Sequence, residues 1–179
     1  MKRAFITLVI LIVCGFTSVL SAQTTSGIST QRIGYINTDS ILVKIPAYVS
    51  AVKELDRLSN EYQKKIESEV KKIETLYQNY QSQKARLSES EKARREQEII
   101  DKEKEVKKLQ QTYFGQDGYM NKKSDELLKP IREKVQQAID KVAELGKFMI
   151  IFDIAAIQGV AYYAPGDNLN SYVLRLLRL

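Results

Sequence analysis

Residues 87–91, Leu-Ser-Glu-Ser-Glu, lie in the middle of the longest charged stretch of this sequence and decide how the chain folds. Ser88 and Glu91 have the spacing of a capping box, in which a serine side chain and a glutamate three residues later satisfy the free N–H groups that begin a helix. Two stretches of equal length, 47–86 and 91–130, lie on either side. The segment therefore predicts a helical hairpin. One unbroken helix, twice as long, is the alternative.

Apolar residues repeat at helical spacing on both sides of this turn. A disordered charged segment has no reason to keep such a register, so both halves are expected to form amphipathic helices that pack along a coiled-coil-like seam. The spacing is three or four residues in the first half and seven in the second, at Val49, Val52, Leu55, Leu58, Tyr62, Ile66, Val70, Ile73, Tyr77 and Tyr80, then at Ile99, Val106, Tyr113, Met120 and Leu127.

The sequence before the hairpin predicts one strand and one short helix. Residues 32–37 alternate between apolar and polar side chains, as a short strand does. Residues 38–40, Thr-Asp-Ser, offer an N-cap for a brief helical turn. Pro46 closes that turn and, as a residue tolerated in the first turn of a helix, can open the first long helix.

The sequence after the hairpin supplies the rest of a small α+β head. Residues 148–153 are apolar on both faces, which predicts a strand buried in a core, residues 160–164 predict another strand, and Asn170 is expected to cap a last helix. Three short strands make a small core, so pairing of strand edges between copies is expected to make the protein a homo-oligomer. The residues expected in the head core and in contacts between copies are Ile33, Tyr35, Ile36, Met149, Ile150, Ile151, Phe152, Val160 and Tyr162.

Residues 1–22 have the layout of a cleavable secretory signal peptide. Two basic residues, Lys2 and Arg3, follow Met1, and after them come an apolar run over residues 4–16 and then small residues. A membrane anchor, the alternative, needs about 20 apolar residues, and this run stops at Thr17. Cleavage would remove Cys14, the only cysteine, so the exported chain is expected to lack disulfides.

The chain is thus expected to have four parts. These are the signal peptide at 1–22, the first strand and short helix of the head at 23–46, the hairpin arm at 47–130 with its turn near 87–90, and the helix base, two strands and last helix at 131–179.

Composition argues against catalysis. The 179 residues include no histidine, so Ser-His and Cys-His pairs and His-based metal sites are excluded. A carboxylate pair is the remaining option, but most of the 22 acidic residues lie on predicted helix surfaces, and Asp39 and Asp153 lie beside turns or strand ends. We expect no enzymatic activity, no cofactor and no metal.

Basic and acidic residues are interleaved along the predicted arm. The 28 basic and 22 acidic residues of the whole chain give a net charge of +6, and two of the basic residues belong to the signal peptide. The arm has 18 basic and 16 acidic residues. Nucleic-acid binding favours a stripe of one sign, so no nucleic-acid partner is expected. Weak contact with anionic lipid headgroups stays open, as does association with a membrane.

The order of these segments resembles the Skp (OmpH-like) periplasmic chaperone family over essentially the whole mature chain. The residues that carry the resemblance are Ile-Gly-Tyr-Ile-Asn at 33–37, Phe-Met-Ile-Ile-Phe-Asp at 148–153, Gly-Val-Ala-Tyr-Tyr at 159–163, and the helix at Asn170. Members of this family are homotrimers in which strands of three protomers build a small barrel and three hairpins surround an open cavity. They hold unfolded outer-membrane β-barrel proteins in the periplasm without ATP. The resemblance implies the same for this chain.

Aromatic side chains on the arm are the candidate contacts for such a client, because their rings are apolar and most have a hydroxyl that can stay in water. At heptad spacing, however, most of them are expected to pack one helix on the other. Phe114 and Tyr119 lie outside the strict register and are therefore the stronger candidates. The full set is Tyr62, Tyr77, Tyr80, Tyr113, Phe114, Tyr119 and Met120.

Gly115 and Gly118 interrupt the returning helix of the arm. Glycine inside a helix costs about 1 kcal/mol relative to alanine, so two close together mark a soft point. We expect the arm to bend here and vary the width of the cavity. Close packing of the two helices is the alternative reason for these glycines.

The sequence thus predicts an ATP-independent periplasmic holdase for unfolded outer-membrane proteins. It has no Gly-x-x-x-x-Gly-Lys-Ser/Thr nucleotide loop, which suits binding by many weak contacts. A non-catalytic coiled-coil structural or adaptor protein of the cell envelope is the alternative.

Overall fold

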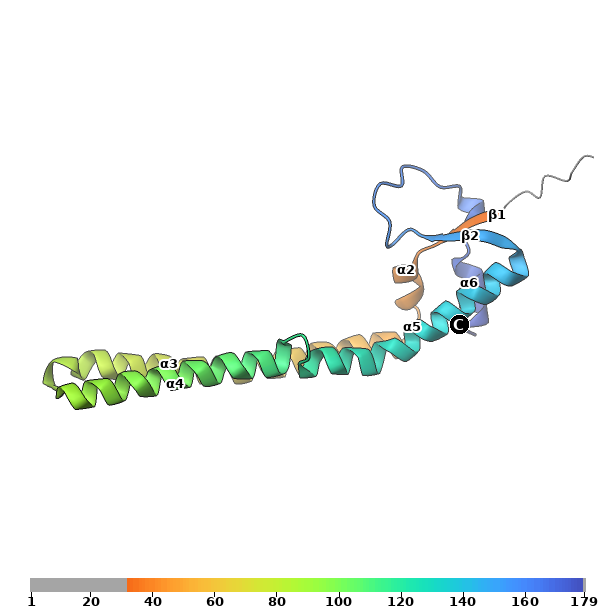
Figure 1. The fold of residues 1–179 in the computed structure, drawn as a ribbon. Helices are drawn as coiled ribbons and strands as arrows, with labels where there is room; N and C mark the ends of the chain where they lie inside the picture. The colour runs from red at the N-terminus through yellow and green to blue at the C-terminus, as the bar shows by residue number, and fades with distance from the viewer. Residues whose placement is uncertain (1–31, 179) are drawn as a thin grey trace, which may run out of the picture. The chain divides into compact units, whose positions relative to one another are not determined.

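The structure is a computed structural model that describes residues 32–178 (Figure 1). The predicted signal peptide lies outside these residues. Along the chain the elements are β1 (Arg32–Ile36), α2 (Thr38–Leu42), α3 (Pro46–Gln83), the 3-10 turn η2 (Lys84–Arg86), α4 (Glu89–Phe114), α5 (Tyr119–Gly146), β2 (Phe148–Asp153), the 3-10 turn η3 (Pro165–Asp167) and α6 (Asn170–Leu176).

The long helices form the predicted hairpin, and the unbroken-helix alternative is wrong. Helix α3 runs out, η2 turns the chain, and α4 returns beside α3 (Figure 1). The capping box lies where it was expected: the Ser88 backbone N–H donates to Glu91 Oε2 over 3.0 Å, and the Glu91 N–H donates to Ser88 Oγ over 3.4 Å. Pro46 is the first residue of α3, as its fixed φ favours.

The seam between the arm helices buries only part of the periodic set. Ile66 and Tyr80 of α3 and Ile99 and Val106 of α4 are buried, whereas Val70 stays more than a third exposed. Two helices can bury only one narrow stripe of each, so the flanking apolar positions face solvent. Helix α5 then continues without interruption through Pro130 into the head.

The core of the head joins segments from both ends of the described chain. Residues Ile41 and Val173 are fully buried, and they pack with the inner face of α5. Burial of large aliphatic side chains contributes about 1.5–3 kcal/mol each, so this cluster is what fixes α2 and α6 to α5. Its members are Ile36, Ile41, Val135, Ala138, Val142, Leu169 and Val173.

The sheet of the head is smaller than predicted. It contains two parallel strands, β1 and β2, in which Gly34 faces Ile151 and Tyr35 faces Phe152. The predicted third strand at residues 160–164 is wrong for the single chain, because this segment forms a loop. The other edge of β1 is already occupied, since the Leu169 N–H donates to the Tyr35 carbonyl over 2.9 Å.

Strand β2 also differs from the prediction of burial on both faces. Met149, Ile150 and Phe152 are exposed in the single chain, and Ile151 alone of these four packs against the core. A two-stranded sheet has too few neighbours to cover both faces of a strand. The head of one chain therefore leaves apolar sheet surface in contact with solvent.

Two predicted helix caps differ in the structure, and asparagines are involved in both differences. Helix α2 is capped by Asn37, whose side chain accepts from the Ser40 N–H over 2.8 Å, and not by residues 38–40. Asn170 does not cap α6; its Oδ1 accepts from the Asn37 N–H over 2.9 Å and so links α6 to the end of β1. Asparagine serves both purposes because its short side chain binds nearby backbone groups.

Candidate functional site

Four aromatic rings meet on the arm at the junction of α4 and α5. Tyr62 of α3 stacks on Tyr113 of α4, with ring centroids 4.2 Å apart and planes 6° apart. Phe114 meets the edge of Tyr62 at 6.5 Å, and Tyr119 is tilted against Tyr113 at 6.1 Å. Lys65 lies over the Tyr62 ring at 5.4 Å, a cation–π contact. We define Tyr62, Tyr113, Phe114 and Tyr119 as the arm cluster.

The junction itself is a short ordered loop. Helix α4 ends at Phe114, α5 begins at Tyr119, and the Gly118 N–H donates to the Gly115 carbonyl over 2.9 Å. The Asn121 side chain donates to the Gly115 carbonyl over 3.1 Å and to the Gln116 carbonyl over 3.0 Å. The glycines thus separate two helices rather than soften one, and bending at this point stays a prediction.

Close backbone approach explains why both positions are glycine. A Cβ on Gly115 would lie 2.4 Å from the Gln111 carbonyl oxygen, and one on Gly118 would lie 2.9 Å from the Tyr113 carbonyl oxygen. Real Cβ atoms do not approach backbone atoms this closely. The loop and the position of the aromatic rings beside it therefore depend on these two residues.

The seven candidate contact residues fall into three groups, which are exposed, half-buried and buried. Tyr77, Phe114 and Tyr119 are 53%, 39% and 56% exposed, while Tyr62, Tyr113 and Met120 are half-buried. Tyr80 is only 3% exposed; its hydroxyl donates to Glu96 of α4, and this hydrogen bond raises the pKa of Tyr80. Tyr80 therefore belongs to the seam and not to the exposed surface.

A second apolar surface lies farther along the arm. A shallow groove of about 470 Å³ between α3 and α4 is lined by the apolar side chains of Val70, Ile73, Tyr77, Ile99 and Val106. The charged residues Glu74, Glu103 and Lys107 line the same groove. An apolar strip with charged borders can take an apolar side chain while the rest of a bound segment stays hydrated.

Charges on the arm are paired locally. On α3, Arg57 bridges Glu54 at 2.8 Å and Glu61 at 3.1 Å, and Lys65 bridges Glu61 at 2.7 Å. These hydrogen bonds to cations lower the pKa of Glu54 and of Glu61. Exposed pairs of this kind contribute little to stability, and along the arm they leave a surface of mixed sign.

In the head, the candidates for contact between copies are partly buried and partly exposed. Tyr35 and Ile36 are buried, whereas Ile33, Val160 and Tyr162 are exposed beside the exposed residues of β2. A pocket of about 390 Å³ on this side is lined by Ile33, Phe152, Ile157, Val160, Tyr162 and Tyr163, among others. We define the exposed apolar residues of this part of the head as the sheet face; they are Ile33, Met149, Ile150, Phe152, Val160 and Tyr162.

The sequence prediction missed residues that matter at both surfaces. Tyr163 packs against Tyr35, with ring centroids 4.6 Å apart, and Leu169 contributes to the core from the position just before α6. The signal for Tyr163 was present, because it lies in the apolar segment at 160–164. The contacts of Lys65 and Asn121 could not be predicted from the sequence, because they depend on how the helices meet.

Residues 32–178 contain neither a cluster of metal ligands nor a membrane-spanning helix. Between residues 32 and 178, no three Asp, Glu, His or Cys side chains are grouped so that they could hold a metal ion. The helices of that region are also too short or too polar for any of them to cross a membrane.

Comparison with known proteins agrees with this architecture. Residues 32–177 match the family described as "Outer membrane protein (OmpH-like)". "Chaperone protein Skp" from Photorhabdus laumondii and the protein of the same name from Photorhabdus luminescens are each 29% identical over 151 residues, which cover 82% of this chain and 86% of the relative.

A solved structure shows the same fold at low identity. The crystal structure of an OmpH-like protein from Caulobacter crescentus aligns with a TM-score of 0.62 and 12% identity, over 89% of this chain and 92% of that one. Because the family match spans nearly all of the described residues, this protein belongs to the OmpH-like outer membrane protein family.

Proposed function

We propose that this protein is an ATP-independent periplasmic chaperone that holds unfolded outer-membrane β-barrel proteins and prevents their aggregation. The relatives named "Chaperone protein Skp" support this proposal, since the match includes the arm and the head. The observation that carries it is the set of exposed aromatic side chains, Tyr77, Phe114 and Tyr119, on an otherwise charged arm.

The arm suits weak and reversible binding of an unfolded barrel strand. Such a strand alternates apolar and polar side chains, and it aggregates when its edge meets another edge. Its apolar side chains can contact the arm cluster and the groove beside Tyr77, while its polar side chains stay near the mixed charges of the arm. Several such contacts, each weak, hold a client and still release it without an energy source.

The chaperone is proposed to act as a homo-oligomer, and the family resemblance implies a trimer. The sheet face supports self-association, because Met149, Ile150 and Phe152 are apolar and exposed in the single chain. Strand β2 also has an edge with no strand partner in residues 32–178. In the proposed assembly the loop at 160–164 and β2 contact neighbouring copies, and the arms surround the client.

The test is suppression of aggregation combined with sedimentation. An outer-membrane barrel protein is diluted from urea with and without the mature chain, and light scattering is followed. We expect the mature chain to keep the client soluble and to sediment as an oligomer. A monomer that leaves scattering unchanged would contradict the proposal and favour the structural or adaptor alternative.

A variant of the exposed aromatics tests the proposed surface. Changing Tyr77, Phe114 and Tyr119 to Gln should reduce client capacity, because these rings supply exposed apolar area, while glutamine keeps the helices. The control changes Gln78 of α3 and Gln111 of α4, which are exposed near Tyr77 and Phe114 in the sequence, to Ala. An equal loss of client capacity in the variant and in the control would show that these aromatic residues are not the client surface.

A further inference from the structure

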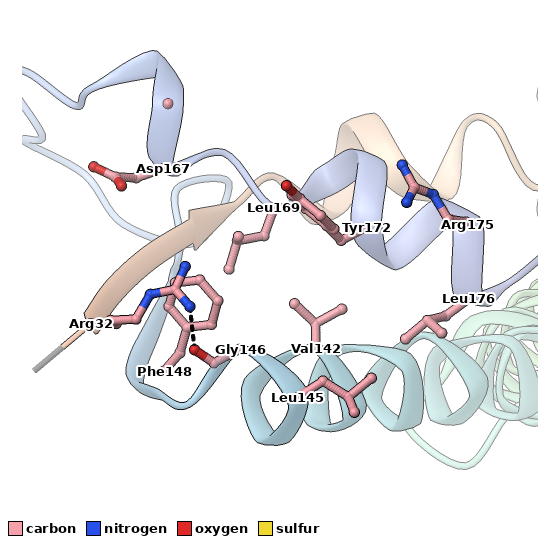
Figure 2. A pocket seen from close by; sticks show the side chains of 11 residues that line it. Arg32, Val142, Leu145, Gly146, Phe148, Asp167, Leu169, Tyr172, Arg175 and Leu176 are labelled. Carbon is pink, nitrogen blue, oxygen red and sulfur yellow. Dashed lines mark hydrogen bonds between the residues drawn. The ribbon is translucent and has the colours of Figure 1, made fainter.

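A pocket in the head lies apart from the arm and from the sheet face. It has a volume of about 460 Å³ and is enclosed by the end of α5, the beginnings of β1 and β2, and α6 (Figure 2). Its apolar lining comes from Val142, Leu145, Phe148, Leu169 and Leu176. This volume falls in the range of about 300–1,000 Å³ that is typical of sites for small ligands.

Two arginines border this apolar pocket on opposite sides (Figure 2). Arg32 is held in place: its guanidinium stacks on Phe148 at 4.3 Å, and its Nη1 donates to the Gly146 carbonyl over 2.5 Å. Arg175 lies over Tyr172 at 5.6 Å. A guanidinium that is already fixed loses less conformational entropy when it binds a further group.

Neither arginine has an ion-pair partner among residues 32–178. In the part of the chain that the structure describes, the ion pairs lie on the arm, and none includes Arg32 or Arg175. Asp167 also lines the pocket, but its carboxylate is turned away from the apolar side chains (Figure 2). The pocket thus combines an apolar interior with positive charge and fits a ligand that is apolar and anionic.

We infer that this pocket binds the C-terminal end of a client chain. The last side chain, an apolar one, enters between α5 and α6, and the terminal carboxylate pairs with the free N–H groups of Arg32, with Arg175 adding positive charge. Guanidinium groups favour carboxylates because their planar N–H groups match the two oxygens. The inference rests on the proposed chaperone function, and it assigns to the head a specific contact beside the many weak contacts of the arm.

The proposed chaperone function favours a peptide end over an anionic lipid, because an unfolded client presents an apolar last side chain and a terminal carboxylate next to each other. Binding of a lipid is therefore treated as a contradicting outcome of the test.

The test uses a fluorescein-labelled peptide of about ten residues with alternating Thr and Val, the pattern of a barrel strand, and Leu at its end. The mature full chain is titrated into the free acid and into the C-terminal amide, and fluorescence anisotropy is measured. The acid should bind about tenfold more tightly, as loss of one charge-assisted hydrogen bond implies. Equal affinity of acid and amide would overturn the inference.

Substitutions locate the binding. Leu145 lines the pocket and is 79% exposed, so two substitutions of this residue can be compared. Leu145→Glu should repel the peptide carboxylate, while Leu145→Lys should keep the peptide bound. Arg32→Gln should also weaken binding of the free-acid peptide. Lys141→Gln removes a charge from α5 outside the pocket and should leave that binding unchanged. Circular dichroism confirms folding. Unchanged affinity in folded Leu145→Glu and Arg32→Gln would overturn the inference.

Two further measurements separate the possible failures. In the first, vesicles that contain anionic lipid are mixed with the mature chain and with Leu145→Glu. If the vesicles bind the mature chain and not Leu145→Glu, and the peptide does not bind, the pocket is a lipid site and the inference is overturned. Aggregation suppression is measured on the same samples. Suppression without peptide binding overturns the pocket inference alone, whereas absence of suppression contradicts the proposed function.

Discussion

At the scale of single residues, Ser88 and Glu91 show how two side chains set the course of the chain. They satisfy free N–H groups at the start of α4 and so fix where the second helix of the arm begins. Ser88→Ala removes this cap and should destabilise the arm by about 1 kcal/mol. Chemical denaturation measures the loss. Ser90→Ala is the control, and an equal loss there would contradict a specific role of Ser88.

The same cap predicts a dependence on pH. Hydrogen bonds from the Ser88 side chain and backbone lower the pKa of Glu91 below its ordinary value of 4.5. A lowered folded-state pKa means that the carboxylate stabilises the fold above pH 4.5, and that this contribution is lost as the pH falls through the lowered value. The melting temperatures of the natural chain and Glu91→Gln should therefore differ more at pH 7 than at pH 3. A constant difference would contradict the prediction.

The junction glycines give a third prediction at this scale. Gly115→Ala places a Cβ against the Gln111 carbonyl oxygen, so it should lower the melting temperature and expose amides around Tyr113 to hydrogen exchange. Gly166→Ala is the matched control, since nothing lies within 4 Å of a Cβ there. Similar melting temperatures for the two variants would show that the junction tolerates a side chain.

At the scale of elements, the hairpin was predictable because its signals are local. A capping box and a regular apolar spacing act within a few turns of one helix, and they specify the turn and both arms. Which segment an element pairs with depends on residues far away in the sequence. The segment at 160–164 has the composition of a strand, but Leu169 occupies the edge of β1. Likewise, the stack of Tyr62 on Tyr113 depends on the relative register of two helices, which the period of each helix does not specify.

The short helix α2 has one fully buried side chain, which packs in the core of the head. Ile41 is fully buried in the core, whereas Val43, two residues later, faces solvent. Ile41→Ala should therefore cost about 2–5 kcal/mol, because it removes buried methyl groups and leaves a cavity. Val43→Ala should change stability by less than about 0.5 kcal/mol. Urea denaturation compares the two, and equal effects would show that α2 is not anchored by Ile41.

At the scale of the whole molecule, the exposed sheet face predicts that the head assembles with other copies. Met149→Glu together with Phe152→Glu places charges on this face and should shift the sedimentation coefficient toward that of a monomer, since buried unpaired charges are costly. Lys141→Glu changes the charge of α5 away from this face and should leave the oligomer intact. An unchanged oligomer in the double variant would place the contact between copies elsewhere.

The parallel pairing of β1 with β2 also determines when the head can form. The two strands are separated in the sequence by the whole arm, so β1 is synthesised long before its partner. Local helical contacts form faster than pairings between distant segments, and closure of a long loop carries an entropic cost. The hairpin removes most of that cost, because it returns the chain to the place where it left the first strand. The folded arm thus brings the two strands of the head together, and a newly synthesised chain completes its sheet last.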